Sequence, residues 1–162
     1  HNCISAIGNL VTAPENGEKL ITFRNGYLVT KLLDVSLSGM STCARRRAMR
    51  SVRCLASARA ASSMANHNVL TSLENVVLLD DDHATRAQGT EALIALSTAD
   101  SLVEHHYQFS SVLRTMFRVM ALSEDCRCVE IMCKHLPQFI SSIYKFHPLN
   151  LAEYTELDNA LS

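Results

Sequence analysis

The clearest chemical feature of this 162-residue chain is a group of arginines on one predicted helix. Arg46, Arg50 and Arg53 stand at positions i, i+4 and i+7, and Arg47 lies beside them. Residues at this spacing share one helix face. A guanidinium group binds a carboxylate through two parallel hydrogen bonds. If this face lines a groove, the sequence predicts a surface that binds an acidic segment of a partner protein.

Two other interpretations of the arginines stay open. The arginines can form a solvated face that the acidic run 80–82 partly neutralises. They can also contact nucleic acid, but the net charge of −1 and the lack of interleaved aromatic residues disfavour this interpretation. Binding of another protein is therefore the expectation that we carry forward.

A second cluster, Cys126, Cys128, Cys133 and His135, has residue types that bind zinc. On a helix, Cys126 and Cys133 share one side, whereas Cys128 and His135 lie roughly 160–200° away at about 100° per residue. Four ligands on one helix cannot surround a metal ion tetrahedrally. We predict structural cysteines here, with no metal and no cofactor.

The histidines do not form a catalytic pattern. His83 follows three aspartates, and His105 and His106 lie between Glu104 and Tyr107. None of them has a nucleophile and an orienting acid at catalytic spacing. The chain also lacks a glycine-rich phosphate loop, a nucleophile elbow and a zinc-protease helix motif. The sequence therefore predicts a protein that is not an enzyme.

Composition favours a folded, helical protein. Hydrophobic residues make up 48% of the chain and charged residues 19%, with three prolines and five glycines. Helix-breaking residues are thus rare. No apolar run approaches the roughly 20 residues of a membrane-spanning helix, so we expect no membrane insertion. We interpret the six cysteines as buried free thiols of a reducing compartment. The chain lacks an initiator methionine, and we expect it to be a fragment of a longer protein.

Apolar spacing and capping residues predict a succession of helices. The predicted helices cover residues 2–12, 14–23, 28–37, 43–58, 60–66, 69–78, 83–96, 101–109, 112–120, 126–136, 139–144 and 149–162. Pro14 suits a first helical turn, and Gly26 can adopt the positive φ that ends the second helix. Ser41 or Thr42 can cap one later helix, and the run 80–82 another. We expect Pro137 to interrupt the chain between two helices.

The helix pattern repeats. Leu28, Leu70 and Leu113, near the starts of three helices, lie 42 and 43 residues apart. Leucines near the ends of the long helices recur at intervals of 45, 41 and 40 residues, at positions 10, 55, 96 and 136. Periods of about 40–47 residues built from helices are typical of armadillo and HEAT units.

The segment from Asn9 to Ala56 resembles an armadillo repeat. The resemblance includes Asn9-Leu10, the Pro14-Glu15-Asn16 turn, the Gly26-Tyr27-Leu28 corner and Leu55-Ala56, and it covers most of the chain up to about residue 124. In that family the third helices line a concave groove, where an asparagine near the helix end holds an extended peptide. Asn9 matches that position, whereas the aligned Cys54, Ala95 and His135 do not. The chain has no tryptophan, so the resemblance does not imply the peptide ladder of nuclear-import adaptors.

From these observations we expect an all-α fold, an α-solenoid of about three armadillo-like repeats of three helices with partial flanking repeats. The alternative is a helical bundle without repeats. The expected single domain spans residues 1–162. It divides into a partial unit 1–13, full units 14–57, 58–98 and 99–136, and a partial unit or tail 137–162. Each unit would bury its apolar helices against its neighbours. Neighbouring repeats or partner subunits are then expected at both ends.

The expected function is a protein-interaction scaffold or adaptor, a subunit of a larger cytoplasmic or cytoskeletal assembly. Asn9, Arg46, Arg47, Arg50 and Arg53 are the predicted partner-binding residues. One alternative is a helical-repeat regulatory domain of a larger enzyme. A second is a nucleic-acid-associated repeat protein, which would bind RNA or DNA with strong salt dependence.

Overall fold

The computed structural model describes residues 2–38, 41–58, 61–99 and 106–146. This part of the chain is all-helical and contains no strand. Its helices are α1 (Asn2–Leu10), α2 (Pro14–Thr22), α3 (Tyr27–Leu37), α4 (Thr42–Ala56), α5 (Ala61–Met64), α6 (His67–Leu79), α7 (His83–Thr98), α9 (His106–Leu122) and α10 (Cys126–Phe146). The predicted helical class is confirmed.

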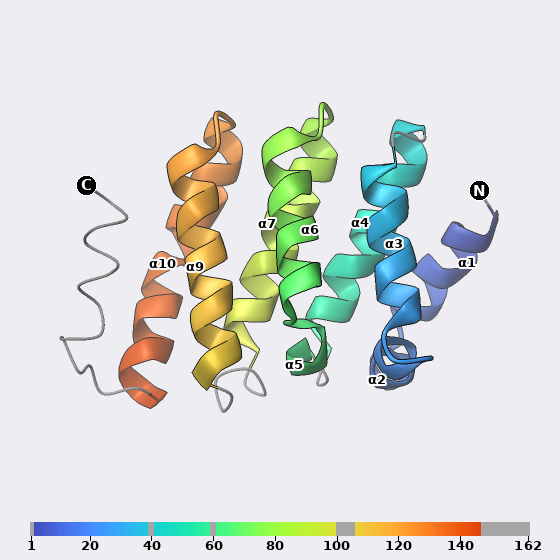
Figure 1. Cartoon of the computed structure of the whole chain (residues 1–162), viewed down its shortest axis with the longest axis horizontal. Helices are drawn as coiled ribbons and strands as arrows, with labels where there is room; N and C mark the ends of the chain where they lie inside the picture. Colours follow the sequence, from blue (N-terminus) through green and yellow to red (C-terminus); the bar gives the residue numbers. More distant parts are fainter. Residues whose placement is uncertain (1, 39–40, 59–60, 100–105, 147–162) are drawn as a thin grey trace.

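The helices stand in two rows (Figure 1). One row consists of α3, α6 and α9, in which α6 contacts both of the others. The second row consists of α1, α4, α7 and α10, each in contact with the next. The rows pack against each other through the pairs α3–α4, α6–α7 and α9–α10, and the short helices α2 and α5 lie at one edge. This arrangement is compatible with a helical repeat.

Side-chain caps fix where three of these helices begin. Ser41, Asn66 and Asp82 each accept a hydrogen bond from the backbone N–H three residues ahead, at 3.4, 3.1 and 2.8 Å. Such caps satisfy N–H groups that have no partner inside the helix. At the corner before α3, Arg24, Asn25 and Gly26 all have positive φ, with 83° at Gly26. Glycine adopts this conformation without a steric penalty.

The core lies between the rows, and α4 and α7 occupy its centre. On α4, Ala48, Met49, Val52 and Leu55 are fully buried. Gly89 lets α7 approach α6 closely, because a Cβ atom at this position would lie 2.9 Å from Cγ2 of Val77. The larger set of buried apolar residues forms one continuous core across the described helices.

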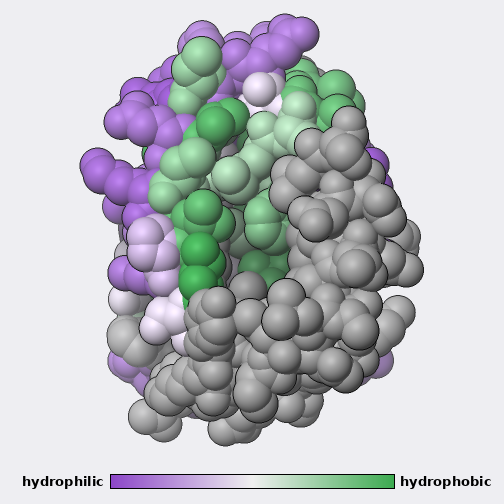
Figure 2. Space-filling model, turned by 90° about the vertical axis from the view of Figure 1, so that its left-hand side faces the viewer, coloured by the Kyte–Doolittle hydropathy of each residue, from purple (hydrophilic) through white to green (hydrophobic). Residues whose placement is uncertain are grey.

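The end of the molecule at α10 exposes apolar residues. Whereas α7 has α4 on one side and α10 on the other, α10 contacts α7 and α9. Its Ile140 is 44% exposed and its Leu136 is half-buried. Figure 2 shows apolar residues gathered in a stripe on this end.

Three sequence expectations need correction or fall outside the described residues. Pro137 does not interrupt the chain, because α10 continues through it, so the predicted boundary between residues 136 and 137 lies inside one helix. Of the predicted short helix 101–109, residues 101–105 lie outside the described residues, and 106–109 belong to α9, which continues through the predicted boundary before residue 112. The tail 149–162 lies wholly outside the described residues. We found no helix among the described residues with the length and apolar character needed to span a bilayer.

The cysteines are free, but most of them are not buried as we expected. Cys128 is buried and Cys54 is half-buried. Cys3, Cys43, Cys126 and Cys133 are exposed. Burial raises the pKa of the Cys128 thiol, which keeps it protonated at neutral pH.

Candidate partner-binding pocket

The structure divides the predicted arginines between two sides of α4. Arg46 donates from Nε to Oδ2 of Asp82 at 2.8 Å, and Arg53 donates to Glu91 at 2.6 Å. Both carboxylates belong to α7 or its cap, so these arginines hold α7 against α4. The acidic run 80–82 therefore neutralises Arg46. Arg47 and Arg50 lie on the side of α4 that meets α1.

A pocket of about 260 Å³ lies between α1 and α4. Three of the five predicted partner-binding residues, Asn9, Arg47 and Arg50, line it together. The lining residues are Ile4, Gly8, Asn9, Val11 and Thr12 from α1 and the turn after it, and Arg47, Arg50 and Ser51 from α4. The structure thus brings Asn9 and two arginines together, and it places Arg46 and Arg53 elsewhere.

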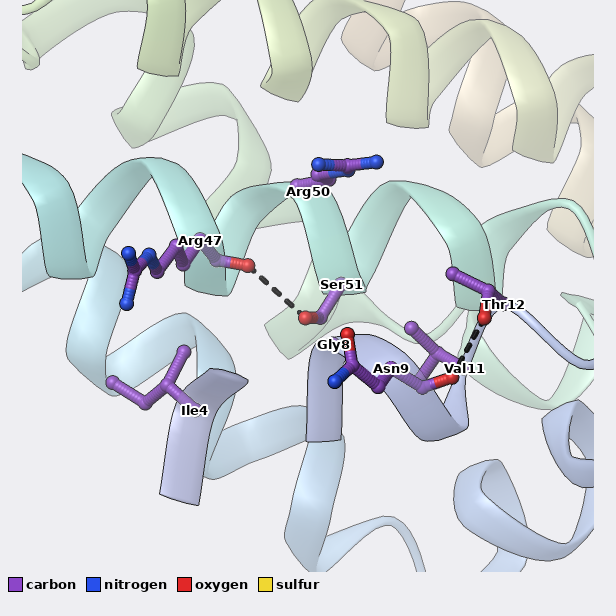
Figure 3. A pocket seen from close by; sticks show the side chains of 8 residues that line it. All are labelled: Ile4, Gly8, Asn9, Val11, Thr12, Arg47, Arg50 and Ser51. Carbon is purple, nitrogen blue, oxygen red and sulfur yellow. Dashed lines mark hydrogen bonds between the residues drawn. The ribbon is translucent and has the colours of Figure 1, made fainter. Parts of the chain in front are cut away.

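Local hydrogen bonds shape the walls of this pocket. The Ser51 hydroxyl donates to the carbonyl of Arg47 at 3.0 Å, and the Thr12 hydroxyl donates to the carbonyl of Asn9 at 2.6 Å. Both hydroxyls therefore already donate to backbone carbonyls of the preceding turn (Figure 3). The side chains of Asn9, Arg47 and Arg50 are exposed.

The three exposed polar side chains have different directions. Figure 3 shows Arg47 extending toward Ile4, Asn9 lying beside Ser51, and Arg50 extending away from α1. The floor between them is apolar, since Val11 is 6% exposed and Ile4 is partly buried. The pocket therefore combines an apolar floor, a primary amide and two separated cations. Such a site suits several contacts along a segment better than one compact anion.

Arg45, which the sequence analysis did not select, lies in a buried ion-pair cluster. Its Nε donates to Oδ2 of Asp80 at 3.0 Å, and its guanidinium also contacts Asp81. The side chains of Arg45 and Asp80 are 10% and 5% exposed. One signal could have revealed this residue: Arg45 precedes Ala48, Met49 and Val52 at i+3, i+4 and i+7, which places a cation on the apolar face.

The next pair of helices repeats this contact. Arg86 lies in the first turn of α7, as Arg45 does in α4, and donates to Asp125 just before α10 at 2.7 Å. His83 Nδ1 lies 3.1 Å from the same carboxylate. We call the residues Arg45, Arg46, Arg86, Asp80, Asp82 and Asp125 the arginine–aspartate ladder. It joins the first turns of α4, α7 and α10.

The ladder stabilises the ionised form of two of its aspartates, Asp82 and Asp125. The hydrogen bond from Arg46 holds the pKa of Asp82 well below its usual range, and Thr85 assists. Burial alone would raise the pKa of Asp125, but hydrogen bonds from Arg86 and His83 outweigh burial and lower it. Hydrogen bonding to Asp80 raises the pKa of Arg45. All three groups are therefore charged at neutral pH.

These shifts predict a loss of stability in acid. A carboxyl group whose pKa is lower in the folded state stabilises the fold above its unfolded pKa, near 3.9, and this contribution is lost as the pH falls further. We expect the urea midpoint of the wild type to drop between neutral pH and about pH 3. The variant Asp82→Asn/Asp125→Asn should be less stable at neutral pH and lose less on acidification. Equal losses in both proteins would contradict the role of the ladder.

No protein-family model, curated protein or solved structure matches this chain. The resemblance to armadillo repeats therefore stays a prediction from the sequence.

Proposed function

We propose that this chain is a non-catalytic scaffold or adaptor that binds an acidic segment of another protein at the α1–α4 pocket. The observation that carries the proposal is the division of the arginines. Arg45, Arg46 and Arg53 are bound to aspartates and a glutamate of the neighbouring helix. Arg47 and Arg50 have exposed side chains and line a pocket that also contains Asn9.

The chemistry of the pocket specifies the kind of segment. Arg50 is exposed and forms no ion pair within the part of the chain that the structure describes. It can bind a partner carboxylate through two hydrogen bonds. The Asn9 amide can donate to a peptide carbonyl and accept from a peptide N–H. The apolar floor at Ile4 and Val11 suits an aliphatic side chain between acidic residues.

The proposal includes the architecture around the pocket. We take the paired helices to be about three armadillo-like units of an α-solenoid, in which α4, α7 and α10 are equivalent third helices. The two rows and the recurrence of the ladder after 41 residues, from Arg45 to Arg86, support this arrangement. Further repeats or subunits of the assembly would cover the two ends. Exposed free cysteines suit a reducing, cytoplasmic or cytoskeletal location.

A direct test uses a fluorescent peptide of glutamates interrupted by single leucines. Anisotropy is expected to show binding that weakens as salt is added. The variant Arg47→Glu/Arg50→Glu should bind at least about tenfold more weakly, a difference of roughly 1.4 kcal/mol. A peptide with lysines in place of the glutamates should not bind the wild type.

Two variants make this test specific. Gly8→Leu should block the pocket without changing any charge, since a Cβ atom there points at Ser51 Oγ from 3.6 Å. Lys134→Glu changes one exposed cation of α10 in the same helix row and should leave binding intact. Circular dichroism melts confirm that each variant folds. Wild-type affinity in the double arginine variant, or no binding by the wild type, would refute the proposal.

A further inference from the structure

The segment 149–162, which comes shortly after α10 and lies outside the described residues, has the composition of a ligand for the α1–α4 pocket. It contains three carboxylates, at Glu153, Glu156 and Asp158, and no lysine or arginine. In the run Glu156-Leu157-Asp158, an aliphatic residue stands between two acidic residues. This is the kind of sequence that the proposed function requires of a partner.

The α1–α4 pocket has the complementary chemistry. Among the described residues, its lining contains two arginines and no carboxylate. Arg50 is exposed and forms no ion pair within the described part of the chain, so its guanidinium group can take a carboxylate through two hydrogen bonds. Val11, 6% exposed, and the partly buried Ile4 form an apolar floor that suits Leu157. Charge and apolar character of the pocket therefore both match the segment.

The acidic run 80–82 is already bound within the fold. Asp80 and Asp81 contact Arg45, and Asp82 contacts Arg46. The side chains of Asp80 and Asp82 are also only 5% and 10% exposed. This run therefore cannot serve as a ligand for the pocket. The segment 149–162 has no cation of its own, so a cation that pairs with its carboxylates comes from elsewhere.

The pocket and α10 lie toward opposite ends of the molecule, and α7 lies between α4 and α10 (Figure 1). Two helix-to-helix steps of about 8–10 Å each separate α4 from α10 sideways. Phe146 is the twenty-first residue of α10 and Arg50 is the ninth of α4, which adds about 18 Å along the helix axes. The end of α10 is therefore roughly 25 Å from Arg50 in a straight line.

This distance favours binding between molecules. Ten residue steps join Phe146 to Glu156, and they cover about 35 Å when fully extended. They cover only about 20 Å with the helix that the sequence predicts over 149–162. Within one molecule, the segment would have to give up that helix and extend over most of its length. A second copy can approach the segment freely, so it imposes no such requirement.

We propose that the segment 149–162 of one copy of this chain binds in the α1–α4 pocket of a second copy. The inference rests on the proposed function and names its partner. The carboxylates of Glu156 and Asp158 bind Arg50 and Arg47 of the second copy, and Leu157 lies on the apolar floor. This contact joins two different surfaces, so each complex keeps a free pocket and a free segment. Head-to-tail growth into a ring or an open series follows.

Sedimentation velocity of the whole chain over a concentration series tests the contact. The wild type is expected to form reversible oligomers that grow with protein concentration and shrink as salt is added. Arg47→Glu/Arg50→Glu, the pocket variant, and Glu156→Gln/Asp158→Asn, the segment variant, should each be monomeric alone. An equimolar mixture of the two should form a dimer and stop there, because it contains one kind of intact pocket and one kind of intact segment.

A matched control removes two carboxylates elsewhere. Glu15→Gln/Glu18→Gln neutralises two exposed glutamates of α2 and should associate as the wild type does. Melting curves followed by circular dichroism establish that all variants fold. A wild type that stays monomeric throughout the series would overturn the inference, and this includes the case in which the segment occupies the pocket of its own molecule. Association that survives in the pocket variant or in the segment variant would also overturn it.

A fluorescent peptide of residues 149–162 distinguishes failure of this inference from failure of the proposed function. The peptide should bind the segment variant, whose pocket is intact, at least about tenfold more tightly than it binds the pocket variant. If the peptide of glutamates and leucines binds and this peptide does not, the pocket keeps its proposed function and the inference about the second copy is wrong. If neither peptide binds, both proposals are wrong.

Discussion

Replacing Arg45 by methionine is expected to lower the free energy of unfolding by about 3 kcal/mol, or roughly 10 °C in melting temperature. The reason is that methionine leaves the Asp80 carboxylate buried without the Arg45 cation. Asp80 is 5% exposed, and Arg45 is its nearest cation. The loss lies at the lower end of the range for broken buried pairs, because Asp80 also accepts the N–H of Asp82 at 2.8 Å.

Asp80→Asn in the Arg45→Met background should restore part of this stability. The substitution removes the uncompensated charge, and the amide oxygen still accepts from Asp82. Lys31→Met is the control, since the pair Lys31–Asp34 has side chains that are 53% and 54% exposed. Losing an exposed pair should leave the melting temperature unchanged. A loss in the control as large as in Arg45→Met would refute the importance of burial here.

Truncating Leu73 to alanine is expected to destabilise the fold by roughly 2–5 kcal/mol. Leu73 is fully buried in the core, with 0% of its surface exposed to solvent. It lies in the middle of α6, which packs against both α3 and α9. Alanine would leave a cavity that the surrounding helices can fill only partly. Urea unfolding followed by circular dichroism measures the change.

The same substitution on the same helix supplies the control. Leu79 is 76% exposed, so Leu79→Ala should change stability by no more than about 0.5 kcal/mol. The middle pair, α6 and α7, contacts α3 and α4 on one side and α9 and α10 on the other, so weakening it should also loosen the two ends from each other. Unfolding of Leu73→Ala in two steps would show that the ends fold separately. A wild-type midpoint in Leu73→Ala would contradict the central position of α6.

Local chemistry made much of the helical structure predictable. Periodic apolar residues predicted α3, α4, α6 and α7, and Ala44, Val52 and Leu55, which recur at helical spacing on α4, are all buried. Ser41 and Asp82 cap helices as their residue types suggested. These features depend on contacts within a few residues, so they are encoded in short stretches of sequence.

Pro137 shows the limit of local rules. Proline inside a helix removes one backbone hydrogen bond and disfavours the helical conformation of the preceding residue. We therefore expected a break, but α10 continues through this position. On the N-terminal side of Pro137, Cys128 and Met132 are buried and Leu136 packs against the core, which holds this part of the helix in place. Packing outweighs local propensity here.

By itself, the sequence determined the helical class, the caps and the inward faces, because each follows from spacing within one helix. Only the tertiary structure decided what the arginines do. Arg46, Arg47, Arg50 and Arg53 are nearly equivalent on an isolated helix. The carboxylates that bind Arg46 and Arg53 lie 36 and 38 residues further on, and α1 forms the pocket wall on the other side. Which arginines bind carboxylates of α7 and which line the pocket depends on which helix packs on each side of α4.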